Sequence, residues 1–147
     1  MLKPLFQTGN DVSSLILRVA LGVVILPHGL QKLLGMFGGY GFAGTMNHFT
    51  QNMGIPYLLA LLVIVAESFG ALGLILGLFT RLAALGIGCV MLGAILMVHA
   101  KIGFFMNWSG QQAGEGFEYH ILALAMALAL LIKGGGMLSL DRKIAGE

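Results

Sequence analysis

Charged side chains are scarce in this chain, since Asp, Glu, Lys and Arg together make up only 10% of its 147 residues. Hydrophobic residues make up 58% and the mean hydropathy is +0.93, which leaves too little polar surface for a soluble domain of ordinary size. Cysteine is nearly absent, and the lone Cys89 excludes dithiol exchange within the chain. We therefore expect residues 1–147 to form one all-α integral membrane domain.

Several chemical signatures are missing as well. The eight lysines and arginines are scattered and form no basic arm, so we expect no nucleic-acid partner. The sequence has no phosphate-binding glycine loop, nucleophile elbow or zinc motif, and we expect no metal site. A carboxylate-bridged di-iron bundle needs two Glu-x-x-His units, and the spacing from Glu118 to His120 does not fit one. A haem between His28 and His99 would suit the sequence, but any two membrane histidines would suggest the same, and we do not favour it.

Four apolar stretches fill most of the chain, at residues 13–35, 57–80, 82–100 and 117–133. A membrane-crossing helix needs about 20 apolar residues, so the first three are long enough and the fourth is the shortest. The pattern predicts an integral membrane four-helix bundle. Pro27 and His28 interrupt the first stretch and no small-x-small cleavage site follows it, so we interpret it as a retained helix rather than a signal peptide.

Basic residues predict the orientation of these helices. With four crossings both termini share one side, and most basic residues fall on it: Lys3, Arg18, Arg81, Lys133, Arg142 and Lys143. Only Lys32 and Lys101 fall on the opposite side. The positive-inside rule then places the N- and C-termini in the cytoplasm.

Polar residues of three helices would share the outer half of such a bundle. They are His28, Gln31, Lys32, His99, Lys101, Glu118 and His120. Within the first helix Arg18, Gly22, Ile25, Gly29 and Lys32 recur at a 4-3-4-3 spacing, which predicts a stripe that faces protein rather than lipid. The sequence therefore predicts a polar interior near the outer leaflet.

Arg18 and Glu67 lie deeper in the predicted bundle. An ionised side chain near the middle of the bilayer costs at least a few kcal/mol, so we expect the two to pair. Structural interpretations stay open, because Arg18 can extend to the cytoplasmic interface, and Lys32, Lys101 and His120 can serve as interfacial anchors.

Between the first two stretches, residues 35–56 combine glycines with an amphipathic pattern. Phe42, Met46, Phe49 and Met53 recur at a 4-3-4 spacing, which predicts a short interfacial helix on the outer membrane surface. Such a helix would be a structural lid or the entrance for a lipid-soluble ligand. The loop at 101–116 carries Trp108 and is also expected at the interface.

Several motifs, taken in order, resemble the DoxX family. They are Leu-Arg-Val-Ala-Leu-Gly at 17–22, Pro-His-Gly-Leu-Gln-Lys at 27–32, Glu67 with Gly70, Gly-Leu-Phe-Thr-Arg-Leu-Ala-Ala at 77–84, His99 with Gly-Phe-Phe at 103–105, Gly116 with Glu118, and Ser-Leu-Asp at 139–141. The similarity covers essentially the whole chain. Pro27 departs from the family, which commonly has a small residue there, and so do Tyr119 and His120, where the family is usually apolar.

This resemblance implies a multi-pass protein of the bacterial inner membrane. Named relatives include a small subunit of a thiosulfate:quinone oxidoreductase, and others are linked to thiol and oxidative stress or to resistance to quinones and catechols. The family pattern directs attention to one set of residues in this sequence: Arg18, His28, Gln31, Lys32, Glu67, Arg81, His99 and Glu118.

Our leading hypothesis is a subunit of a redox-associated complex that binds a quinone or a similar aromatic ligand in the outer half of the bundle. His28 or His99 would hydrogen-bond a quinone carbonyl, and Glu67 would accept or deliver a proton. The expected ligand-binding residues are Arg18, Gln31, Lys32, Glu118 and His120. Since nothing in the chain carries electrons alone, a partner redox protein or a bound cofactor must supply them.

Two other classes of function stay open. The chain can be a non-enzymatic membrane scaffold, chaperone or cargo-binding subunit whose polar core only fixes the packing of the helices. A small transporter for a weak acid or a sulfur anion is a further alternative, and it would require a water-accessible route. Glycine-rich faces are compatible with a homo-oligomer.

Overall fold

The computed structural model describes residues 3–146, and every regular element among them is helical. The long helices are α2 (Val12–Leu34), α6 (Thr80–Met97), α7 (Glu118–Lys133) and a continuous helix built from α4 (Tyr57–Val65), the π-helical turn η3 (Ala66–Gly70) and α5 (Ala71–Leu76). The short elements are α1 (Lys3–Phe6), η1 (Met36–Gly38), α3 (Gly41–Asn47), η2 (His48–Asn52), η4 (His99–Lys101) and α8 (Leu140–Ala145). The all-α prediction is confirmed for these residues.

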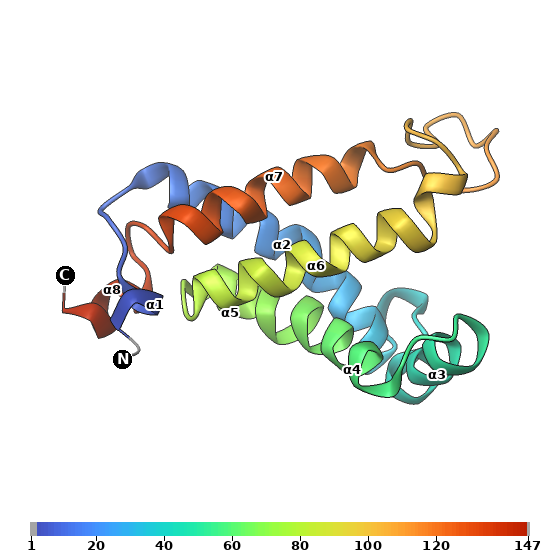
Figure 1. Ribbon diagram of the computed structural model, residues 1–147, viewed down its shortest axis with the longest axis horizontal. Coiled ribbons are helices and arrows are strands. Elements are labelled where there is room, and N and C mark those ends of the chain that lie inside the picture. The colour runs from blue at the N-terminus through green and yellow to red at the C-terminus, as the bar shows by residue number, and fades with distance from the viewer. Residues whose placement is uncertain (1–2, 147) are drawn as a thin grey trace.

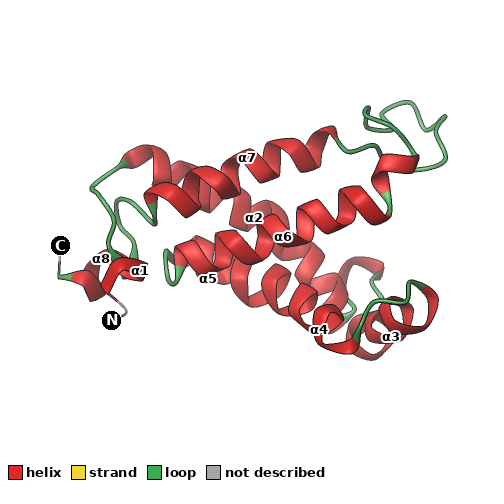
Figure 2. Ribbon diagram, in the orientation of Figure 1, coloured by secondary structure: helices red, strands yellow, loops and turns green. Residues whose placement is uncertain are grey.

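The long helices run between two ends of the molecule. Figure 1 shows both chain termini, α1 and α8 at one end, and α3 and the loop before α7 at the other. We refer to these as the terminal end and the loop end. Figure 2 shows that the irregular segments are confined to the two ends. The chain therefore traverses the length of the molecule four times.

Three helices are long and apolar enough to cross a membrane, at Val12–Leu34, Tyr57–Leu76 and Thr80–Lys101. They correspond to the first three predicted stretches. The fourth predicted stretch is shorter, because α7 has 16 residues and rises about 24 Å, against a hydrocarbon core of about 30 Å. Three of the four predicted crossings thus have the required length.

Two predicted boundaries are wrong at the turn between the second and third helices. Residues 77–80 were expected to finish the second helix, but α5 ends at Leu76, where Gly77 adopts a left-handed φ of 66°. Thr80 is the first residue of α6 rather than the last residue of its predecessor. The cause lies far away in sequence: the carboxylate of Asp141 accepts the backbone N–H groups of Phe79 and Thr80 at 2.7 and 2.8 Å.

The protein-facing stripe of α2 is confirmed, since Arg18, Gly22, Ile25 and Gly29 are all buried. They pack in a core shared by four long helices, whose buried members are Leu21, Ile25, Ala71, Leu74, Ala83, Ala84, Ile87, Met91, Ala123, Ala127 and Leu130. Small residues in this core let the helices approach closely. Large apolar side chains face outward instead, among them Leu58, Leu62 and Phe69, as expected for a lipid-facing surface.

The segment at 35–56 is helical, as its pattern predicts. Met46 is buried against Ala60 and Ile64 of α4, with Phe49 packed beside them. Most of the expected polar face is exposed. Thr45 is the exception, with only 4% of its surface exposed. Packing against α4 therefore accounts for Met46 and Phe49, whereas Phe42 is exposed, and contact of the segment with a membrane stays a prediction.

Candidate functional site

Arg18 lies at the terminal end with 2% of its surface exposed, and it donates hydrogen bonds only to backbone carbonyl oxygens. The acceptors belong to Leu74 (3.0 Å), Ile75 (2.5 Å), Gly135 (2.9 Å), Met137 (3.2 Å) and Leu138 (3.0 Å). The first two are carbonyls in the last turn of α5, and that of Leu74 also accepts the N–H of Gly77 at 3.2 Å. Arg18 thus ties α2 to the end of α5 and to the turn after α7.

The expected pair between Arg18 and Glu67 is wrong. The charge of Arg18 interacts instead with the carboxylate of Asp141, a residue that is only 1% exposed. Both Asp141 oxygens accept backbone N–H groups at the start of α6. Arg18 and Asp141 therefore join the ends of four helical segments rather than hold a ligand.

Arg81 donates hydrogen bonds to carbonyl oxygens at the end of α7. Its Nη1 donates to the carbonyl oxygens of Leu131 and Ile132, the second at 2.6 Å, and its Nη2 donates to that of Gln7 at 3.3 Å. Thr8 accepts the N–H of Gly136 at 2.7 Å and donates to the carbonyl of Lys133 at 3.2 Å. We use the name terminal clasp for Arg18, Arg81, Asp141 and the backbone of residues 134–139.

Glu67 lies toward the loop end with 5% of its surface exposed, and its partner is Lys32. The Lys32 Nζ atom is 2.5 Å from Glu67 Oε2. The contact is an ion pair without hydrogen-bond geometry at Oε2. Gly29 makes it possible, since a Cβ atom there would lie 2.3 Å from the carbonyl oxygen of Glu67. The approach of α2 to η3 brings Lys32, one turn further along α2, to the carboxylate.

Glu67 also sits in the π-helical turn Ala66–Gly70, within an otherwise α-helical segment. Such turns are uncommon and concentrate at functional sites, because the extra residue shifts side chains out of the regular α-helical positions. Next to Glu67, Ser68 is 2% exposed and its hydroxyl has no hydrogen-bond partner. The turn therefore directs an acid and an unsatisfied hydroxyl into the interior.

The two histidines expected near the outer leaflet on α7 and after α6 lie in contact. The ring centroids of His99 and His120 are 4.1 Å apart, with 40° between the ring planes. His99 Nδ1 bonds the carbonyl oxygen of Glu115 at 2.8 Å, whereas His120 is 7% exposed and its Nδ1 has no partner. The hydroxyl of Tyr119 is likewise buried and unpartnered, and it lies within electrostatic range of Glu67.

We use the name loop-end cluster for these groups, namely Lys32, Glu67, Ser68, His99, Tyr119 and His120. His28 borders it, with an exposed side chain that lies within electrostatic range of His120. The structure thus brings together four of the predicted site residues, which are Lys32, Glu67, His99 and His120. Ser68 and Tyr119 were missed, although a serine beside a lone glutamate in an apolar helix was a usable signal.

Gln31 and Glu118 are engaged in loop contacts instead. Gln31 Nε2 donates to the carbonyl of Phe37 at 3.3 Å, within the turn that follows α2. Glu118 Oε1 accepts the N–H of Met106 at 2.8 Å, and Glu115 Oε2 accepts that of Asn107 at 2.7 Å. Both carboxylates hold the loop before α7 in place. In this structure Gln31 Nε2 and Glu118 Oε1 are therefore bonded to backbone groups of loops.

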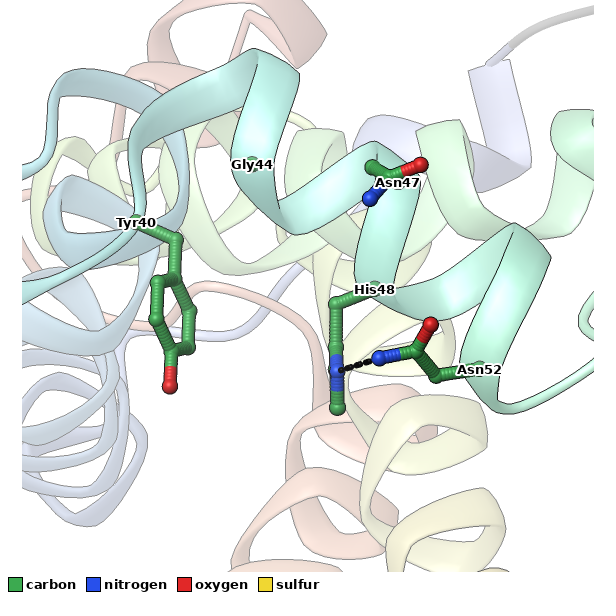
Figure 3. A pocket seen from close by; sticks show the side chains of 5 residues that line it. All are labelled: Tyr40, Gly44, Asn47, His48 and Asn52. Atoms are coloured by element: carbon green, nitrogen blue, oxygen red, sulfur yellow. Dashed lines mark hydrogen bonds between the residues drawn. The ribbon is translucent and has the colours of Figure 1, made fainter.

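An open pocket of about 290 Å³ lies apart from the cluster, on α3 and η2. Figure 3 shows the Tyr40 and His48 side chains flanking it, with the Asn52 amide 3.4 Å from His48 Nδ1. Asn47 and Gly44 complete the lining. None of these residues was a predicted site residue. Among residues 3–146 no three His, Cys, Asp or Glu side chains are placed to hold a metal ion.

Comparison with known proteins agrees with the motifs. The family profile of DoxX matches residues 13–100. "Putative oxidoreductase CatD" of Bacillus subtilis is 30% identical over 131 residues, which are 89% of this chain and 86% of that protein. "Inner membrane protein YphA" of Escherichia coli is 28% identical over 94% of each chain, and "Inner membrane protein YqjF" of the same species is 29% identical over 90% of this chain and 92% of its own. No solved structure matches the chain.

Proposed function

The chain belongs to the DoxX family of membrane proteins, and from this premise we propose that it is an integral membrane subunit that binds a quinone, or a similar aromatic ligand, at the loop-end cluster. One observation carries the proposal. Three buried polar atoms without a partner belong to this cluster, namely Ser68 Oγ, Tyr119 Oη and His120 Nδ1, and they lie in the same cluster as the Lys32–Glu67 ion pair.

The energetic argument is that such atoms are expensive. A buried polar group without a partner costs about 1–3 kcal/mol relative to a bonded one, and most native proteins keep few of them. One of these atoms lies on η3 and two on adjacent positions of α7. A ligand with polar atoms on an apolar ring would satisfy them and would contact Tyr119, which packs against the core.

A quinone fits this donor set, and when bound it would supply two-electron, two-proton chemistry. Tyr119, Ser68 and His28 can donate hydrogen bonds to its carbonyl oxygens. His99 offers only its Nε2, because its Nδ1 is bonded to the Glu115 carbonyl. Glu67 would hold or release a proton, and Lys32 would stabilise the carboxylate. Electrons would come from a partner redox protein, since none of these side chains carries them.

The membrane placement is part of the proposal. The chain would cross four times, with α7 tilted little or lying in a thinned region because it is the shortest. Both termini lie at the same end in Figure 1, which supports an even number of crossings. The terminal end carries most of the basic residues, so the positive-inside rule orients it toward the cytoplasm of the bacterial inner membrane. The loop-end cluster would then lie near the outer leaflet.

Quinone binding to purified protein in lipid nanodiscs tests the proposal. Wild-type protein should retain quinone from its own membrane and bind a short-chain quinone in native mass spectrometry. Glu67→Gln should weaken binding by about tenfold or more, because it removes the charge that Lys32 stabilises. Glu115→Gln is the matched control, since it makes the same change in the loop, where a glutamine oxygen can still accept the Asn107 N–H.

Equal quinone binding by wild type and Glu67→Gln would contradict the assignment. A ligand-free chain that copurifies with a stoichiometric protein partner would favour the scaffold or cargo-binding alternative. Substrate flux in vesicles without bound quinone would favour the transporter. The same mass spectra report whether the chain forms a homo-oligomer.

A further inference from the structure

Two contacting histidines connect the buried part of the loop-end cluster with its exposed edge. We propose that His120 and His99 form the route by which a proton passes between a ligand held at Glu67 and the solution at the loop end. The inference rests on the proposed function and adds to it a path for the proton. It assigns the two rings a role in proton transfer in addition to their place beside the ligand.

The two rings differ in burial, as a route from the protein interior to the solution requires. His120 is buried, with an unpartnered Nδ1, while His99 is partly exposed and adjoins the loop before α7. The centroid separation of 4.1 Å brings the two rings within direct reach, or within reach through one water molecule. The partly exposed ring is therefore the immediate neighbour of the buried one.

The tautomer of His99 is set by the loop. A carbonyl oxygen only accepts hydrogen bonds, so the 2.8 Å contact with the Glu115 carbonyl requires the proton on His99 Nδ1. Its Nε2 is then free to accept a proton from inside. The protonated ring can then lose a proton to water at the exposed edge, and the same steps in reverse carry a proton inward.

The inner end of the route reaches Glu67 through Tyr119. The Tyr119 ring meets that of His120 edge-on at 5.3 Å, and its unpartnered hydroxyl lies within electrostatic range of Glu67. Other ionisable groups border the histidines: His28 on α2, Lys101 beside His99 on η4, and Glu118 at the start of α7. Glu118 is bonded to the loop backbone through Oε1, so Tyr119 is the group that extends the route inward.

A pH jump with a bound reporter tests the route. The probe is a hydroxynaphthoquinone, whose absorption spectrum differs between its acid and its anion, bound to protein in lipid nanodiscs. Stopped-flow absorbance then follows the rate at which the bound probe gains or loses its proton. The variants are His99→Ala and His120→Gln, and His48→Ala is the control, because its exposed ring lies in the separate pocket on α3 and η2.

Measured at probe concentrations that saturate each variant, the bound probe should reach the wild-type final spectrum with a rate constant about 100-fold lower. Added imidazole should restore the rate in His99→Ala, because the space left at the exposed edge admits it. A group that only supports the structure would not be rescued in this way. His48→Ala should behave as wild type.

Wild-type rates in His99→Ala with the probe bound would overturn the inference, and so would a slow rate that imidazole does not restore. His99→Ala decides the matter even if His120→Gln loses the probe, because His99 is at the exposed edge. Failure of the wild-type protein to bind the probe would overturn the proposed function and this inference together. Binding with unchanged rates would overturn the inference alone.

Discussion

The terminal end and the loop end of this molecule both bury polar side chains, but they differ in how fully those side chains are bonded. In the terminal clasp Arg18 donates to five carbonyl oxygens, and both Asp141 oxygens accept backbone N–H groups. In the loop-end cluster Ser68, Tyr119 and His120 each leave a buried polar atom unbonded. Complete bonding indicates a structural role, and incomplete bonding indicates a place for something from outside the chain.

The contrast concerns whole side chains rather than single atoms. The terminal end also contains unpartnered atoms, namely Thr80 Oγ1 and the Nε atoms of Arg81 and Arg142. Each of the two arginines nevertheless donates through its terminal nitrogens. Thr80 has no other polar side-chain atom, so the difference is one of number: one such hydroxyl at the terminal end, against those of Ser68 and Tyr119 and the Nδ1 atom of His120 at the loop end.

Replacing Arg18 should have the largest effect on stability. Arg18→Leu leaves five carbonyl oxygens without this donor, and we expect it to lower the free energy of unfolding by at least about 3 kcal/mol. Unfolding in mixed detergent micelles measures the change. Arg142→Leu is the control, because Arg142 bonds only the exposed Asn10 side chain, and its loss should cost less than about 1 kcal/mol. If the two variants were equally stable, the hydrogen bonds of Arg18 would not stabilise the terminal end, and the contrast with the loop end would fail.

Gly29→Ala should rank second, because it forces α2 away from η3. The added Cβ would lie 2.3 Å from the carbonyl oxygen of Glu67, so the helices must separate, at an expected cost of about 2 kcal/mol. Gly93→Ala makes the same change on α6, where nothing lies within 4 Å of the new atom. Thermal unfolding of both variants measures the difference. If Gly29→Ala were as stable as Gly93→Ala, the close approach would not be needed to form the cluster.

The Lys32–Glu67 pair should give a smaller effect that sharpens the comparison. Lys32→Met leaves a buried carboxylate unpaired, and we expect a loss of about 1–2 kcal/mol, since Lys32 itself is partly exposed. The double variant Lys32→Met with Glu67→Gln should lose less than the sum of the two single variants. A double-mutant cycle of unfolding free energies measures this coupling. Strict additivity would mean that the ion pair contributes nothing.

Asp11 should have the smallest effect, and that effect depends on pH. Hydrogen bonds to its carboxylate hold the pKa of Asp11 well below its ordinary value of 3.8. The largest effect comes from Lys133, followed by Ser13 and Ser14. The stabilisation is therefore fully present above about pH 4 and is lost as the pH falls through the lowered pKa. Asp11→Asn should lower the melting temperature slightly at neutral pH, and its difference from wild type should shrink as the pH falls below 4. An identical acid profile in both proteins would contradict this assignment.

The sequence was sufficient to predict the helices and the depth of the polar groups. Apolar length located the spans, and the 4-3-4-3 spacing identified the buried face of α2, because both depend on local periodicity. Glu67 was expected deeper in the bundle, and Lys32, His99 and His120 were placed at the same end from topology alone. Such predictions need only the order of the helices and the direction in which each one runs.

The bonding partners were beyond the reach of the sequence. Arg18 was assigned to Glu67 because carboxylates are visible in a sequence, whereas its actual acceptors are carbonyl oxygens, which every residue has. Gln31 and Glu118 were assigned to a ligand, although each is bonded to a loop backbone whose conformation no local pattern reveals. The π-helical turn at Ala66–Gly70 also has no distinguishing composition.

That π-helical turn affects how this chain should be aligned with its relatives. A π-helical turn accommodates one residue more than the α-helical path it replaces. A relative with an uninterrupted α-helix here would be one residue shorter, and its alignment would need a single gap between positions 66 and 70. Without that gap, every residue on one side of the turn would be matched to a neighbour rotated by about 100° around the helix axis. Comparisons that locate the acid of this site in other members of the family therefore depend on where that gap is placed.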